Sequence, residues 1–227
     1  MTKINPERLA MLESINLRSG SHDSFDDGVC AMEMVAYLAG LPHSDKPECT
    51  CPVLATFVRS WNDGLPDADR NRLLKPILPA LVNTRSTPEV EKARGFLALD
   101  WLIREYLPMW LETMDDLHDH AAKLRAHAEI VSDESAALVM DDVMAARSAT
   151  GYAADSAADS AAGSAAGSAA SWAAYWAADS AADSAADWAT YWATRLAAEA
   201  ALAPTVAKLQ DSAVNLIERM IAVEVAL

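Results

Sequence analysis

Glycine, phenylalanine and cysteine are scarce in this chain. The 227 residues include 8 glycines, 3 phenylalanines and 3 cysteines. Turns draw heavily on glycine, and alanine, which is abundant here, is the strongest helix former. We therefore expect an all-α fold. Three cysteines are too few for a disulfide framework, and the odd number fits a reducing compartment.

Positive charge is scarce as well. The chain carries 18 basic and 33 acidic side chains, a formal net charge of −15, and a pI near 4.6. Because such a surface repels phosphate backbones and anionic membranes, we expect neither nucleic acid nor membrane as the partner. The start of the chain lacks the basic and apolar regions of a signal peptide, and no uncharged apolar run of about 20 residues occurs. We expect a cytoplasmic protein.

Residues 145–204 form a four-residue repeat, called here the tetrad repeat. In blocks from Ala145 it reads AARS ATGY AADS AADS AAGS AAGS AASW AAYW AADS AADS AADW ATYW ATRL AAEA ALAP, with alanine first in every block. Four residues turn about 400° around an α-helix, so the alanine stripe drifts by about 40° per block. The repeat predicts either one helix about 90 Å long or a hairpin of shorter helices.

Aromatic residues interrupt the tetrad repeat in two clusters, sixteen residues apart. They are Trp172, Tyr175 and Trp176, then Trp188, Tyr191 and Trp192. Since alanine buries little area, the repeat needs partner helices, and we expect the aromatic residues to anchor them in a homo-oligomer. A stacking site for a flat ligand is the alternative, and recurring aspartates in the repeat argue against nucleic acid.

The rest of the chain divides into an N-terminal helical domain, 1–130, and a second part, 131–227. The first has polar loops at 19–28 and 41–51. The second holds the tetrad repeat and a C-terminal helix after Pro204 that we expect to pack on the Ala-rich helices. Apolar spacing and proline positions predict N-terminal helices at 5–17, 29–39, 52–61, 67–82 and 88–106. We expect Pro76 and Pro79 to interrupt the fourth helix and Pro108 to kink or divide the chain after the fifth. A further helix is expected from about Trp110 to about 128.

Chemistry-bearing side chains gather in residues 19–51, which hold all three cysteines and two of the five histidines. Two polar loops flank one short predicted helix, so the loops can meet at its ends. A first interpretation is a tetrahedral zinc site made of His22, Cys30, His43 and Cys49. The spacing does not match that of the common zinc motifs.

A second interpretation is a cysteine nucleophile. Cys30 lies at the start of the predicted helix 29–39, whose N-terminal partial charge should lower the pKa of the thiol. His22 or His43 would act as the base, and Asp23 or Asp45 would orient it.

The third interpretation is structural, and it is the one we favour. Cys30 is then a small buried residue, and the polar side chains cap helices and hold loops. Glu33 fits this interpretation least well, because it lies among apolar residues and needs a partner if buried.

The stretch SGSHDSFDDGVCAMEMVAYLAGLPHSDKPECTCPVLATFVRSWND, the later LALDWLIREYLPMWL, the tetrads and SAVNLIERMI resemble a group of uncharacterised proteins of actinobacteria and their phages. The resemblance implies a bacterial or phage setting. It implies no activity and assigns no residue a role.

Together these patterns predict a non-catalytic interaction protein. It would self-associate through the tetrad repeat and bind or sequester a protein or small-molecule partner. The alternative is a small metal-binding or cysteine-dependent enzyme built on His22, Cys30, Glu33 and His43, with zinc as the cofactor.

Overall fold

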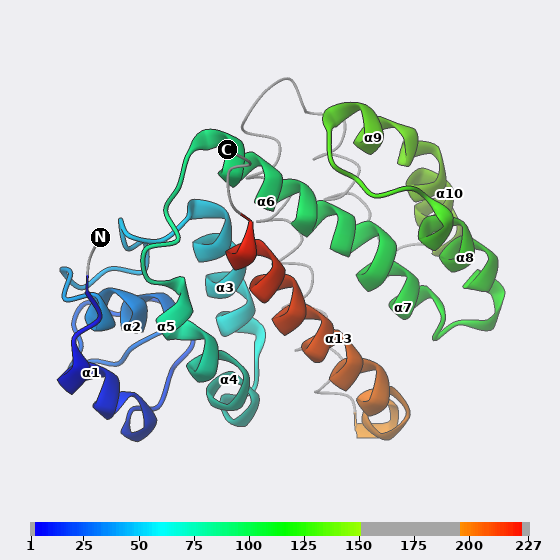
Figure 1. The fold of residues 1–227 in the computed structure, drawn as a ribbon. Coiled ribbons are helices and arrows are strands. Elements are labelled where there is room, and N and C mark those ends of the chain that lie inside the picture. Colours follow the sequence, from blue (N-terminus) through cyan, green and yellow to red (C-terminus); the bar gives the residue numbers. More distant parts are fainter. Residues whose placement is uncertain (1–2, 151–195, 224–227) are drawn as a thin grey trace.

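The fold is all-α, as the sequence predicts. A computed structural model describes residues 3–150 and 196–223, and these contain helices and loops but no strand (Figure 1). Within these two ranges, no helix combines the length and apolarity that a membrane crossing requires.

The N-terminal third consists of three helices and two long loops. The helices are α1 (Pro6–Met11), extended by the 3₁₀ turn η1 (Leu12–Ser14), α2 (Ala31–Leu38) and α3 (Pro52–Gly64). Asn5 caps α1 through its side-chain oxygen. All residues of α2 except Tyr37 are buried, so this short helix lies inside the core and positions both polar loops around it.

Prolines divide the next helical stretch, as predicted. It consists of α4 (Asp67–Leu74), the 3₁₀ turn η2 (Lys75–Ile77) and α5 (Leu78–Leu81). Pro76 and Pro79 lie at the starts of the second and third pieces. A proline has no N–H to donate to the preceding turn, which is why the α-helix stops at these points.

A long helical rod follows, made of α6 (Pro88–Trp101), the π-helical turn η3 (Leu102–Tyr106) and α7 (Leu107–Leu111) (Figure 1). The π-helical turn directly precedes α7, where Pro108 cannot donate a hydrogen bond, so the predicted disturbance is a local change of helix type. The prediction of one continuous helix from about Trp110 to about 128 is wrong, because the helix is interrupted after α7. A 3₁₀ turn, η4 (Asp115–Leu117), precedes α8 (His118–Ala126).

The last described helices are α9 (Asp133–Leu138), α10 (Met140–Thr150) and α13 (Leu196–Ala222). Both described ends of the tetrad repeat are therefore helical, at the end of α10 and the start of α13. The C-terminal helix begins before Pro204, not after it, and contains this proline. It packs against α6 and α7, so its described contacts are with the N-terminal part of the chain.

One hydrophobic core runs through the described residues. Phe57 and Trp101, whose rings meet edge to face at 5.6 Å, belong to it. So do Val143 on α10 and Leu216 on α13. Residues on both sides of position 130 therefore contribute to this core.

Candidate functional site

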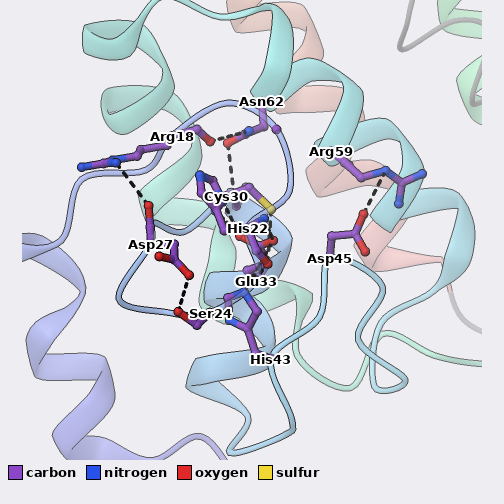
Figure 2. A network of polar contacts seen from close by, with 12 residues as sticks. Arg18, His22, Ser24, Asp27, Cys30, Glu33, His43, Asp45, Arg59 and Asn62 are labelled. Atoms are coloured by element: carbon purple, nitrogen blue, oxygen red, sulfur yellow. Dashed lines mark hydrogen bonds and ion pairs between the residues drawn. The ribbon is translucent and has the colours of Figure 1, made fainter.

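Glu33 lies at the centre of a buried polar network, called here the Glu33 network, with His22, Cys30 and His43 (Figure 2). Glu33 is the third residue of α2 and only 1% exposed. Its Oε2 accepts the backbone N–H of Cys30 at 2.8 Å, and the Cys30 sulfur accepts the backbone N–H of Glu33 at 3.5 Å. This reciprocal pair is a capping box with cysteine where serine or threonine usually stands.

Both loops of the candidate window are fastened to Glu33. The backbone N–H of His22 donates to Oε1 at 2.7 Å, and its ring Nδ1 donates to Oε2 at 2.8 Å. His43 Nε2 donates to the His22 carbonyl at 2.9 Å and lies 3.6 Å from Glu33 Oε1. The loops 19–28 and 41–51 therefore meet at the N-terminal end of α2, as predicted.

The network keeps Glu33 ionised. Burial raises the pKa of this carboxyl, but the hydrogen bonds from the backbone N–H groups of Cys30 and His22 and from the His22 ring outweigh burial and lower it. The sequence argument that Glu33 needs a partner if it is buried is confirmed, since it has three hydrogen-bond donors.

The pKa of the Cys30 thiol shifts in the opposite direction, upward. Burial, together with the nearby Glu33 charge, raises the pKa of Cys30 to about 12. The sequence predicts a lowered pKa at this helix end, but desolvation of the fully buried sulfur outweighs the lowering by the backbone hydrogen bonds from Glu33 and Met32. The His22 and His43 rings bond to Glu33 and to the His22 carbonyl rather than to the sulfur, so the geometry gives no support to a Cys30 nucleophile.

The predicted orienting aspartates are not paired with a histidine. Asp45 Oδ2 lies 4.0 Å from Nε of Arg59 on α3, and the carboxylate that holds the His22 ring is Glu33 (Figure 2). The far side of that ring packs on Gly28, where a Cβ atom would stand only 2.7 Å from His22 Nε2. Gly28 also has φ of +142°, so both the close contact with the ring and the backbone conformation require glycine.

The zinc site predicted from His22, Cys30, His43 and Cys49 is not assembled. Across residues 3–150 and 196–223, no three His, Cys, Asp or Glu side chains are arranged to hold a metal ion. The two imidazoles are bonded to Glu33 and to a carbonyl. Cys49 is half-buried, with its sulfur 3.8 Å from Thr50 Oγ1.

Sequence reasoning missed Asn62, which is fully buried on α3. Its side-chain oxygen accepts the N–H of Ala31 at 3.1 Å, and its amide nitrogen donates to the carbonyl of Arg18 at 2.9 Å. Asn62 thus joins α3, the residue before the first polar loop and the start of α2. No sequence signal marked it, because Asn62 stands in a polar stretch with Ser60 and Asp63 that is also typical of a turn.

The predicted aromatic anchors, Trp172, Tyr175, Trp176, Trp188, Tyr191 and Trp192, lie outside the described residues. Their roles as interface or ligand-stacking residues stay predictions.

The geometry of the Glu33 network fits a structural role. Its donors and acceptors bond to one another and to the backbone of two loops and one helix. Comparison with known proteins offers no further guide, since no family model, curated protein or solved structure matches this chain.

Proposed function

We propose that this chain is a non-catalytic interaction protein that self-associates through the tetrad repeat and the helices leading into it. The observation that carries the proposal is a group of exposed apolar side chains just before the repeat. Of the five large hydrophobic side chains exposed in the described residues, three lie between 131 and 144. Val131 is 65% exposed, Leu138 76% and Met144 40%.

Exposure of this kind costs free energy unless another surface covers it. The occupant we propose is a second copy of the chain. The apolar residues continue in sequence into a repeat whose small side chains allow close helix packing and whose tryptophans suit interface anchors.

The attachment of the repeat at both ends supports the same proposal. Before it, α10 packs against α8, and Asp142 Oδ2 accepts His127 Nε2 at 2.8 Å. After it, α13 is joined to α6 by the 2.7 Å hydrogen bond from Trp101 Nε1 to Ser212 Oγ. The described residues therefore hold both flanks of the repeat, as an interface built on the repeat requires.

Sedimentation equilibrium of the full chain tests the proposal. We expect an oligomer, with association weakened by Leu138→Ser and by Trp172→Ala combined with Trp176→Ala. Truncating an interface anchor costs about 2 kcal/mol or more. Leu9→Ser is the control, because Leu9 is 40% exposed on α1, which lies far from α9 (Figure 1). A monomer at high concentration, or equal effects of Leu9→Ser and Leu138→Ser, would contradict the proposal.

A further inference from the structure

A cavity of about 480 Å³ shares no lining residue with the Glu33 network. Its walls come from three segments: the second polar loop, the first turns of α3 and the segment between α5 and α6. The lining residues are Lys46, Pro47, Glu48, Thr50, Pro52, Ala55, Thr56, Arg59 and Arg85.

The floor of the cavity is buried and firmly built. Thr50 Oγ1 donates to the carbonyl of Leu81 at 3.3 Å, and the backbone N–H of Arg85 donates to the carbonyl of Cys49 at 3.1 Å. The N–H of Cys51 donates to Thr84 Oγ1 at 3.1 Å. These bonds fix the loop, the start of α3 and the segment after α5 against one another, so the cavity does not depend on a ligand for its shape.

Positive charge dominates the lining. The lining holds Lys46, Arg59 and Arg85 and one acidic residue, Glu48, while Asp45 and Glu91 pair with the two arginines from outside the lining, in a chain whose acidic residues outnumber the basic ones by 33 to 18. This concentration of cations is the reverse of the overall charge and favours an anionic ligand.

The three cationic side chains of the cavity have N–H donors available for a ligand. Lys46 forms no ion pair with any residue in the described ranges. Arg59 meets Asp45 only through Nε at 4.0 Å, and Arg85 meets Glu91 through Nε at 3.3 Å. The terminal nitrogens of both guanidinium groups are therefore available to a ligand, and this fork matches the oxygens of a phosphate group.

We propose that this cavity binds the phosphate ester of a small organic molecule. Three cationic groups from three segments suit a multiply charged tetrahedral group, and Pro47, Pro52 and Ala55 supply an apolar wall for the organic part. The volume is that of a small-molecule site and exceeds what free phosphate needs. Self-association does not enter the argument, so this proposal stands independently of the proposed function.

Isothermal titration calorimetry of the full chain tests the site with three probes at equal ionic strength: ribose 5-phosphate, inorganic phosphate and citrate. We expect ribose 5-phosphate to bind most tightly. Arg59→Gln and Arg85→Gln should each weaken its binding about tenfold or more, since a charge-assisted hydrogen bond is lost.

Arg125→Gln is the control for loss of a positive charge elsewhere, since Arg125 pairs with Glu112 on the surface of α8. It should change the affinity less than about twofold. Arg85 is exposed, so its variant tests binding without disturbing the core. Absence of ribose 5-phosphate binding, equal affinity for inorganic phosphate or citrate, or equal weakening by Arg125→Gln would overturn the proposal.

Discussion

A buried carboxylate is stable only when its charge is compensated, and Glu33 meets this condition without a lysine or arginine. Two backbone N–H groups and one imidazole N–H donate to its two oxygens. Hydrogen bonds to an ionised group are about twice as strong as neutral ones, which offsets the cost of burial. Glu33 thereby links two loops to α2 through a single side chain.

Replacing Glu33 with glutamine should destabilise the fold in a pH-dependent way. Glutamine presents an NH₂ group to donors that need an acceptor, so we expect a loss of about 3 kcal/mol at pH 7. Because the pKa of Glu33 is lowered in the folded state, its stabilising contribution is present above the unfolded pKa of about 4.3. This contribution is lost as the pH falls through the folded pKa.

Urea unfolding of the wild type and Glu33→Gln at pH 7 and at a pH of about 3 measures this difference. The difference in the free energy of unfolding between the wild type and Glu33→Gln should be smaller at the lower pH. Glu129→Gln, at an exposed position, is the control and should change little at either pH. A gap of the same size at both pH values would contradict the role of the Glu33 charge.

The need of Glu33 for a partner was predictable from its apolar neighbours, but the identity of that partner was not. It depends on how two loops turn back on α2, and loop paths are set by tertiary contacts such as those of Asn62. The shift of Cys30 was mispredicted for the same reason, because the sequence reveals the helix end but not the depth of burial.

Among the helices, α13 depends most clearly on contacts distant in sequence. Arg94 on α6 is 4% exposed, and its Nε–H donates a hydrogen bond to the carbonyl of Met220 at 2.7 Å. Its other nitrogens donate to the carbonyls of Thr84 and Val223. A cation at the C-terminal end of α13 also opposes the negative end of the helix dipole. Arg94 therefore fastens the end of the chain to the rod formed by α6 and α7.

Arg94→Met should loosen α13, since it removes these donors and leaves buried carbonyls unsatisfied. We expect a loss of about 2–4 kcal/mol in the free energy of unfolding, measured by urea denaturation. Arg219→Met is the matched control on α13, where a partly exposed ion pair with Glu105 is lost at a cost of less than about 1 kcal/mol. Equal losses in the two variants would contradict the anchoring role of Arg94.

Helix positions were largely predictable, whereas helix ends and partners were not. Proline and apolar spacing located α3, α6 and the interruptions at Pro76 and Pro79. The prediction that the C-terminal helix begins after Pro204 was wrong, since the helix continues through this proline. The break after α7 was not predicted, because the apolar spacing of Trp110, Met114 and Leu117 continues across it.

At the scale of the whole molecule, the first and last described segments form one body. Met220 on α13 and Leu38 on α2 belong to the same core, although the tetrad repeat separates them in sequence. Described residues on both sides of the repeat, on α10 and α13, therefore belong to one core. In the proposed function, the exposed residues at 131–144 extend the contact surface of the repeat, and the Glu33 network keeps the loops in place.

Native mass spectrometry of the untagged full-length protein tests this account most directly. A single measurement reports both the oligomeric state and any bound metal. The account predicts a mass that is a multiple of the 24.3 kDa chain, with no added metal. A monomer at every concentration would contradict self-association, and an additional mass of about 65 Da per chain, that of a zinc ion, would contradict the structural role of the His22, Cys30, Glu33 and His43 cluster.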